Sequence, residues 1–398
     1  MGILAIRAAR LFDGTGATCT NDPLVIVEDG RIVRVEQGAA PPPGVELVDL
    51  PGATLLPGLI DPHVHLGFDA QPGPIARLVS RSDTEVLESM AAAAAAHLAA
   101  GVTTVRDLGD RDYLAVRLRE EGAGVLPTIL AAGPPITTVD GHCAVLGGEI
   151  AGEVALRAAV RERADRGADV VKIMASGGGM SPTTQMHMPQ FTRAELAAAV
   201  DEAHRVGLPV TVHAHALDAI RNALAAGVDG IEHCTFLVAE GVDAAEDVVA
   251  ELVARQVPVT SVFGIRPVEG APSPPPVVVR NMAAMRAALA GLFARGGRVM
   301  AGPDAGIAPQ KPHGVLPHGL IEMVELGLDP AAVLRANTSV AAVALGLGAT
   351  KGRVAPGLDA DLLAVDGDPV TDTSALLRPV AVFVRGQRVA LRATSAAP

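Results

Sequence analysis

Two histidines separated by one residue, His63 and His65, end an apolar run that begins at Leu55. If that run is a buried strand, residues two apart point to the same face, so both imidazoles can reach one metal ion. An isolated pair of this kind could instead straddle a loop, because short motifs also match by chance. Matching groups recur farther along the chain, and they favour the metal site.

Further apolar segments contain or end in residue types that bind metals. A lysine, Lys172, lies inside a strand-like run, and histidines end two others at His213, His215 and His233. A carboxylate, Asp304, follows a fourth run. In parallel α/β proteins the functional residues lie at the carboxyl ends of the strands. The pattern therefore indicates that these side chains meet at one end of such an arrangement.

The elements that must position these residues are short apolar runs alternating with helical patterns. Strands are expected over 55–60, 103–107, 128–132, 169–175, 209–213, 230–233, 257–262 and 298–302. Helices are expected over 84–100, 153–166, 192–206, 216–226, 243–255 and 281–295, with further helices around 317–327 and 330–346. Eight strands with intervening helices predict a TIM-type (β/α)8 barrel.

Both ends of the chain are rich in β-strand signals. Near the start, Asp29-Gly30 separates two alternating apolar runs, which is the strongest short-range signal for a hairpin. Similar runs occur beyond residue 350. We therefore expect a small β-sandwich built from both termini, with domain boundaries at 1–53, 54–349 and 350–398.

Composition excludes several classes of protein. The chain has 398 residues, 49% of them hydrophobic, so it can bury a large core and is not disordered. Its net charge of −12 and the lack of a long basic run argue against binding nucleic acid or an anionic membrane. The alanine-rich stretch at 90–100 is too short to span a bilayer and is expected to be a buried amphipathic helix.

The cysteines and the N-terminal residues bear on the compartment. Cys19, Cys143 and Cys234 are too few and too scattered for a disulfide framework, so each is expected to be a small buried hydrophobe. Cys234 follows a candidate ligand and should point to the opposite strand face. The first residues show no signal peptide. A cytoplasmic location is expected.

Taken in order, the motifs resemble those of the metal-dependent amidohydrolase superfamily, close to its imidazolonepropionase-like and Xaa-Pro dipeptidase-like branches. The resemblance rests on PGLIDPHVH, VKIMASGGG, VTVHAHA, GIEHC, GPDAG and KGRVAPGLDADLLAVDGDP, which follow one another through most of the chain. It implies a hydrolase of carbon–nitrogen bonds.

The resemblance also implies a ligand set for two divalent metal ions. His63 and His65 would bind the more buried ion with Asp304, and His213 and His233 would bind the second. Lys172 would bridge the two after carboxylation by CO₂, which would also remove a costly buried cation. Its alternative role is a salt-bridged or snorkelling side chain. Zinc is the expected ion, although imidazole and carboxylate ligands also suit manganese, iron and cobalt.

Other histidines and one glutamate have less specific roles. His215 shares a strand face with His213 and competes with it for one ligand position, but the resemblance favours His213 and leaves His215 for substrate contact. Glu232 should lie on the strand face opposite His233 and be structural. His97 and His204 fall in helical patterns, where partial burial is the simpler explanation.

Catalytic roles are expected for two residues. Asp304 could take the proton of a metal-activated water as hydroxide attacks a carbonyl, then pass it to the leaving nitrogen. Its alternative role is metal binding alone. His142, in a loop where related peptidases place a histidine, could donate to the developing oxyanion. A lone loop histidine is otherwise often merely exposed.

Arg106 and His313 are weaker candidates for holding a substrate carboxylate or lining the mouth of the site. Each could equally make a structural ion pair or loop contact. The chain also departs from its dipeptidase-like relatives, which often place a tyrosine shortly after the sixth-strand histidine, where this chain has Phe236. Its one tyrosine is Tyr113, so that hydroxyl contact cannot form locally.

The sequence thus predicts a cytoplasmic binuclear hydrolase, peptidase-like in its relationships, that cleaves a carboxamide or peptide-type C–N bond in an N-acyl amino acid or small dipeptide. The enzyme alternatives are a cyclic amide hydrolase of the imidazolone or hydantoin type, and a deaminase. A non-catalytic scaffold is the alternative of a different class, although every ligand position is filled. The expected partners are a small-molecule substrate and further copies of the chain, with no nucleic acid and no membrane.

Overall fold

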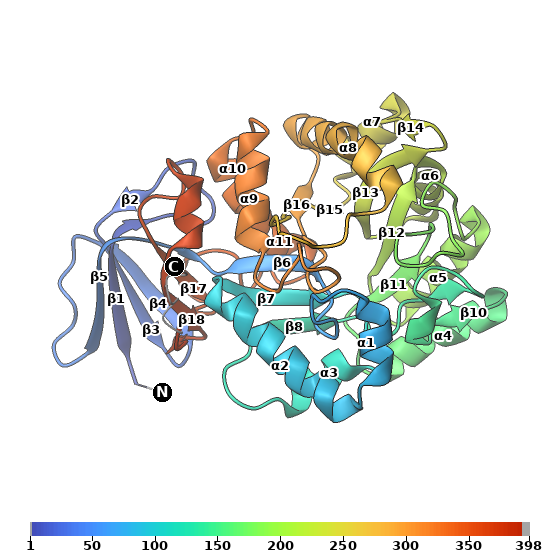
Figure 1. Ribbon diagram of the computed structural model, residues 1–398. Coiled ribbons are helices and arrows are strands. Elements are labelled where there is room, and N and C mark those ends of the chain that lie inside the picture. Colours follow the sequence, from blue (N-terminus) through green and yellow to red (C-terminus); the bar gives the residue numbers. More distant parts are fainter. Residues whose placement is uncertain (1, 392–398) are drawn as a thin grey trace.

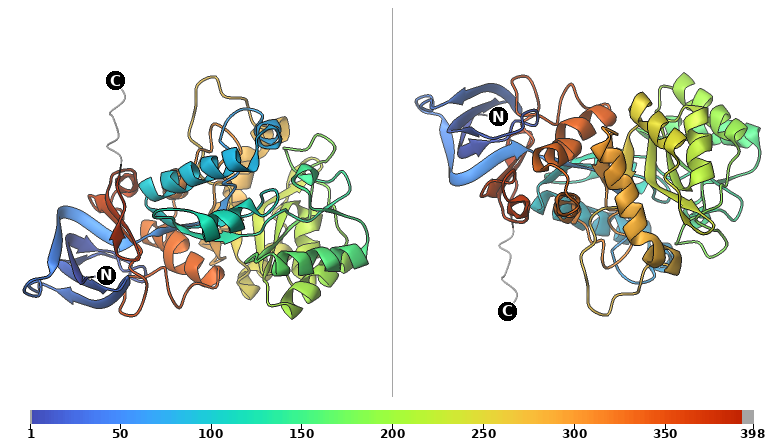
Figure 2. Two further views of the ribbon diagram at one scale, coloured as in Figure 1. Left: turned by 90° about the horizontal axis from the view of Figure 1, so that it is seen from below. Right: turned by 90° about the horizontal axis from the view of Figure 1, so that it is seen from above.

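A computed structural model describes residues 2–391 of the chain. Strands from both ends form one sheet at one end of the molecule, and the middle of the chain forms a body of parallel strands and helices (Figure 1). Two further views show the terminal sheet lying away from helices α4 (Glu153–Asp165) and α7 (Glu246–Arg255) (Figure 2). The protein is therefore of mixed α/β class, as its sequence predicts.

The terminal sheet is organised around strand β5 (Glu46–Pro57). This strand pairs in parallel with β1 and antiparallel with β17, so it joins the two ends of the chain. The other strands are β1 (Leu4–Leu11), β2 (Thr20–Asn21), β3 (Pro23–Glu28), β4 (Arg31–Gln37), β17 (Leu362–Asp366), β18 (Pro379–Val384) and β19 (Gln387–Arg388). The expected hairpin is present between β3 and β4. Hydrogen bonds join these strands into one sheet, and the two-layer sandwich stays a prediction.

Eight parallel strands make the framework of the body. They form two sheets, of which the first is β6-β7-β8 and the second is β11-β12-β13-β15-β16. Their bounds are β6 (Leu59–Val64), β7 (Val102–Asp107), β8 (Thr128–Ala131), β11 (Val171–Met174), β12 (Val210–Ala216), β13 (Gly230–Val238), β15 (Val259–Ser261) and β16 (Val299–Ala301). Each expected run overlaps one of these strands, although β7, β12 and β13 extend beyond their runs and 55–60 is divided at Gly58. A Cβ on Gly58 would lie 2.1 Å from the Thr103 hydroxyl, so only glycine fits between β5 and β6.

The two parallel sheets meet at two seams. At one, the Asp169 backbone N–H donates to the Ala131 carbonyl (2.8 Å). At the other, Val64 and Ala305 form an isolated parallel bridge. Among residues 2–391 no continuous ladder closes the strands into a ring. The closed barrel therefore stays a prediction.

Asn337 fastens the second seam. It lies in a π-helical turn, η2 (Ala336–Val340), and is completely buried. Its amide nitrogen donates to the carbonyls of Ile60 (3.0 Å) and Ala301 (2.7 Å), and its oxygen accepts from the Ala301 N–H (3.0 Å). One side chain thus ties β6 to β16, the strands that lead to His63 and Asp304.

Helices and short elements fill the connections. The remaining helices are α1 (Pro74–Ser80), α2 (Asp83–Ala99), α3 (Leu114–Glu121), α5 (Arg193–Arg205), α6 (Leu217–Ala226), α8 (Pro276–Ala294), α9 (Leu316–Glu325), α10 (Pro330–Arg335) and α11 (Ala341–Ala344). Short strands and 3₁₀ turns are β9 (Thr137–Thr138), η1 (Ala144–Leu146), β10 (Glu149–Ile150), β14 (Gly241–Val242) and η3 (Thr373–Leu377). Capping boxes at Ser82 and Thr192 start α2 and α5. The alanine-rich run is inside α2, as expected.

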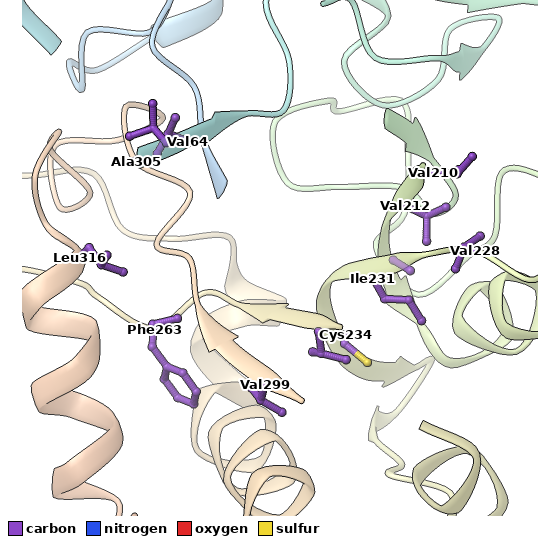
Figure 3. Packing of buried hydrophobic residues seen from close by; sticks show 14 of the residues in the cluster. Val64, Val210, Val212, Val228, Ile231, Cys234, Phe263, Val299, Ala305 and Leu316 are labelled. Atoms are coloured by element: carbon purple, nitrogen blue, oxygen red, sulfur yellow. The ribbon is translucent and has the colours of Figure 1, made fainter. Parts of the chain in front are cut away.

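The main core packs between the strands and these helices. Figure 3 shows part of it, with Val210 and Val212 of β12 close to Ile231 of β13 and to Val228. Cys234 belongs to this core and is completely buried, which agrees with its expected role as a small hydrophobe. The side chains that carry chemistry extend beyond this apolar layer, at the strand ends.

Candidate metal centre

The first group of candidate ligands comes from the ends of β6 and β16. The Nε2 atoms of His63 and His65 lie 3.4 and 3.1 Å from Asp304 Oδ1, and all three side chains are buried. Their donor atoms are close enough together to hold one ion. The ligands expected for the first metal are therefore brought together.

The second group comes from β12 and β13. The ring centroids of His213, His215 and His233 lie 4.5–4.7 Å from one another, and their donor atoms could also hold an ion. His233 is also 5.0 Å from His63, centroid to centroid, so the two groups adjoin. Because both His213 and His215 belong to the second group, the geometry leaves the choice between them open.

Burial keeps the three histidines of the second group neutral, and the neutral imidazole is the form that binds metals. Burial lowers the pKa values of His213 and His233 well below the usual range, and it lowers that of His215 to about 3. Neutral imidazole nitrogen is the ligand that divalent metals accept. His233 Nδ1 is buried with no hydrogen-bond partner among the described residues, so an acceptor site is free.

Lys172 lies beside both groups. Its Nζ is buried and has no hydrogen-bond partner in the described part of the chain. Its positive charge lowers the pKa values of His63, His213 and His233. Burial lowers the pKa of Lys172 itself to about 8, against the opposing pull of nearby carboxylates. An amine of this kind is neutral more often than an exposed lysine, and the neutral amine is the form that reacts with CO₂.

Glu232 corrects one expectation from the sequence. It does not lie on the outer face of β13, because its Oε2 is 2.9 Å from His63 Nδ1. The left-handed backbone of His233 (φ 69°) and Cys234 (φ 49°) breaks the alternation of the strand there, so Glu232 and His233 both face inward. Alternation alone could not show this contact. Glu232 fixes which nitrogen of His63 is left for a metal.

Arg106 neutralises that glutamate. Its Nη2 donates to Glu232 Oε1 (2.8 Å) and its Nε donates to the Pro62 carbonyl (2.9 Å). The Thr211 hydroxyl donates to the same Glu232 oxygen (2.6 Å). Burial would raise the pKa of Glu232, but Arg106 and His63 outweigh it and hold that pKa well below the usual range. Arg106 is absent from the cavity lining, so the structure gives it a contact other than the expected substrate carboxylate.

His313 is also placed away from the cavity lining. Its Nε2 lies 2.8 Å from the Phe68 carbonyl and its Nδ1 lies 3.3 Å from His97 Nε2. His97 is completely buried, rather than partly buried as expected, because α2 packs it against His313. His204, by contrast, is largely exposed and pairs with Asp229 at 2.8 Å.

His142 lines the cavity, beside the second group. Its ring centroid is 4.6 Å from that of His213, and its Nδ1 lies 3.2 Å from the Ser181 hydroxyl. Burial lowers the pKa of His142 to about 4, so the ring is neutral near pH 7 and can donate one hydrogen bond. A Cβ on Gly178 would lie 2.2 Å from His142 Nε2, so the glycine-rich loop leaves room for this ring.

A cavity of about 330 Å³ opens above these residues. We call the seven polar residues at its base the floor: His63, His65, Lys172, His213, His215, His233 and Asp304. We call the apolar residues above them the wall, which is supplied by Met180, Met186, residues 262–265 and 272–275, and α8. A glycine-rich loop, Gly177–Gly179, and a proline-rich loop, Pro272–Pro276, both contribute residues to this lining.

Known proteins resemble the chain over most of its length. It is 26% identical over 426 residues to ochratoxinase of Aspergillus niger, covering 96% of this chain and 84% of that protein. It is 28% identical over 435 residues to imidazolonepropionase of Cereibacter sphaeroides, covering 96% and 97%. A crystal structure of a Xaa-Pro dipeptidase with bound methionine in the active site superposes with a TM-score of 0.85 at 27% identity, covering 97% and 99%.

These relatives confirm the superfamily and both branches that the motifs suggested. Residues 54–389 match the amidohydrolase family, and this span contains every floor residue. The named relatives are hydrolases, and ochratoxinase and the dipeptidase are among them. The chain therefore belongs to the amidohydrolase family, and it is a hydrolase that acts on carbon–nitrogen bonds.

Proposed function

We propose that the protein is a binuclear metal-dependent hydrolase that cleaves the C–N bond of an N-acyl amino acid or a dipeptide-like amide. One observation carries the proposal: two adjoining groups of buried ligands share a neighbour, Lys172, whose Nζ has no partner among the described residues. A carboxylated lysine would give that position two oxygens, which could reach an ion in each group.

The donor set fits two divalent ions, with zinc as the expected metal. His63, His65 and Asp304 would hold one, and His213 and His233 the other, with His215 as the alternative in the second group. When bound, such ions supply Lewis acidity and lower the pKa of water.

The protein's own groups would move the proton. Asp304 is the one carboxylate among the described residues that line the cavity, so it can accept the proton of the attacking water and return it to the leaving nitrogen. Neutral His142 can donate a hydrogen bond to the carbonyl oxygen as negative charge develops there.

A cyclic amide hydrolase is the second candidate function, favoured by the similarity to an imidazolonepropionase. A deaminase with a single ion would not need Lys172 as a bridge, and a non-catalytic scaffold would not need all seven floor residues.

We further propose that residues 54–349 form a closed (β/α)8 barrel and that residues 1–53 and 350–398 form a β-sandwich. We also propose that the protein is a homo-oligomer in the cytoplasm, and that it acts on a small molecule without binding nucleic acid or membrane.

Metal analysis combined with a substrate screen tests the proposal. Protein supplied with zinc and bicarbonate should carry two ions per chain, and a crystal structure should show extra density on Lys172 Nζ. The loaded protein should hydrolyse linear N-acyl amino acids or dipeptides faster than hydantoins and imidazolones. One ion per chain at saturation, with unmodified Lys172, would overturn the binuclear assignment.

A further inference from the structure

The cavity lining beyond the floor is mostly apolar, although it also includes polar side chains such as Gln71, His142, Thr235 and Gln310. Helix α8 supplies the clearest part, with Val278, Met282, Met285 and Leu289 all in the lining. These positions are separated by four, three and four residues, so they lie on one face of the helix. That face is directed at the cavity, where a ligand can cover it.

Methionine is unusually frequent in this wall. Met180 and Met186, in the loop after β11, join Met282 and Met285 in the lining. Methionine side chains are flexible and adapt to irregular apolar groups, so such a wall suits a large apolar ligand of no single shape. The cavity volume of about 330 Å³ is at the lower end of ligand pockets, which is large enough for more than an acetyl group.

Helix α8 is apolar over most of its length. It is the one helix in the described part of the chain with the length and composition of a membrane span, yet only 17% of that window is buried in the protein. Its contacts with β13, β14 and β16 hold it over the body of the molecule (Figure 1). Its exposed positions lie on the outer side, whereas of the cavity-facing residues Met285 and Leu289 are buried and Val278 and Met282 are only partly buried. An apolar ligand in the cavity could therefore cover Val278 and Met282.

Two cations besides Lys172, Arg286 and Lys311, line the cavity, and each has an ion-pair partner. Arg286 is paired with Glu322. Lys311 lies 3.5 Å from Asp304 Oδ2, and among described residues this is its one ion pair. A metal on Asp304 would compete for that carboxylate. Lys311 would then be available to a substrate carboxylate close to the scissile bond.

Tyrosine cannot take that role here. Tyr113, the one tyrosine of the chain, is absent from the cavity lining, and so is the completely buried Phe236. Among the described lining residues, Lys311 is the cation nearest to Asp304, so it is the group best placed to anchor the carboxylate of an amino acid product.

We infer that the substrate is an amide with a carboxylate next to the scissile bond, held by Lys311, and an apolar group much larger than acetyl, held by the methionine-rich wall. This inference rests on the proposed amide hydrolase function and names its substrate class. The apolar group could be the acyl chain or the amino acid side chain, and the test below includes both.

The substrate arm uses metal-loaded protein and glycine acylated with acetyl, butanoyl, hexanoyl or octanoyl groups. Each added methylene that reaches the wall should raise kcat/KM by about fourfold, the factor given by about 0.8 kcal/mol per buried methylene. N-acetylphenylalanine tests the side-chain alternative, and N-ethyloctanamide lacks the carboxylate. Equal kcat/KM values for the whole acyl series and for N-acetylphenylalanine would overturn the inference.

The variant arm changes wall and anchor separately. Met282→Gln should lower kcat/KM for octanoylglycine relative to acetylglycine by about tenfold, because an unpaired amide would be buried beside the octanoyl chain. The matched control, Met188→Gln, changes an exposed methionine outside this cavity. Lys311→Met should reduce the preference for octanoylglycine over N-ethyloctanamide by at least about tenfold, whereas Lys311→Arg should retain it. An unchanged preference in Lys311→Met would overturn the assigned anchor.

A binding arm separates failure of this inference from failure of the proposed reaction. Calorimetry with N-octylsulfonylglycine and N-methylsulfonylglycine, which are sulfonamides, measures the same recognition without cleavage. Tighter binding of the octyl compound, weakened by Lys311→Met, would support the ligand class even if no amide were hydrolysed. Hydrolysis of short amides with equal binding of both sulfonamides would leave the proposed reaction standing and overturn the inference.

Discussion

In the floor of the cavity, polar side chains extend from the ends of five strands and contact one another, whereas in the wall apolar side chains come from one helix and several loops. The floor is tied into the framework: Glu232 holds His63, Arg106 holds Glu232, and Asn337 holds both strands of the seam. The apolar side chains of the wall make no such contacts, although Glu322 of α9 pairs with Arg286 of α8 and accepts from the Gly264 N–H (3.0 Å). The difference suggests that the strands hold the catalytic residues in fixed positions, whereas the helix and loops of the wall determine which substrate binds.

Replacing Glu232 should give the largest effect on the floor. Glu232→Ala leaves the Arg106 guanidinium buried without its partner, which should lower the free energy of unfolding by about 3–5 kcal/mol. It also removes the carboxylate that lies 2.9 Å from His63 Nδ1 and orients this ring, so affinity for metal should fall about 10- to 100-fold. Chemical denaturation and metal titration measure the two effects.

The matched control for that change is Glu246→Ala, which breaks the fully exposed pair with Arg295. It should leave metal affinity and unfolding close to those of the unchanged protein. If Glu232→Ala behaved like this control, the floor would not depend on its connection to the framework.

Asp304→Asn should affect turnover most strongly among the floor ligands. The amide keeps one coordinating oxygen but cannot accept a proton, so much of the metal should remain while kcat falls by at least about two orders of magnitude. Metal content and kcat are measured on the same preparation. Turnover near the unchanged rate in metal-replete Asp304→Asn would assign the proton transfer to another group.

The strand-end residues of the floor were predictable from sequence because side chains two residues apart on a strand point to the same face. Five short apolar runs, each ending in or containing a ligand type, are enough to place His63, Lys172 and Asp304 in one site if the strands are parallel. The shared inward direction of Glu232 and His233 was not predictable, because the left-handed backbone at His233 and Cys234 breaks the alternation that would put them on opposite faces. The orientation of α8 was also hidden, since its apolar residues fit a core helix equally well.

Asn337→Ala tests whether the seam positions the first ligand group. Losing its three hydrogen bonds leaves buried backbone groups of Ile60 and Ala301 without this partner, which should lower the free energy of unfolding by roughly 1–3 kcal/mol. Only the first ligand group lies on β6 and β16, the strands that Asn337 joins. The ion bound by that group should therefore be lost before the ion bound by the second group. Asn222→Ala, which removes a partly buried side-chain bond to Phe191 in another part of the body, is the control. Equal loss from both metal positions would argue against a role for the seam in positioning.

The smallest effect should follow a change in the wall that keeps its volume and polarity. Met285 is buried and faces the cavity from α8, and leucine replaces it with another apolar side chain of similar size. Such exchanges usually change stability by less than about 1.5 kcal/mol. Met285→Leu has no contact in the floor network to disturb, so metal content and the rate on acetylglycine should stay unchanged, while the dependence of kcat/KM on acyl length shifts. Loss of metal in this variant would show that the wall affects metal binding by the floor. The assignment of catalysis to the floor and substrate choice to the wall would then be wrong.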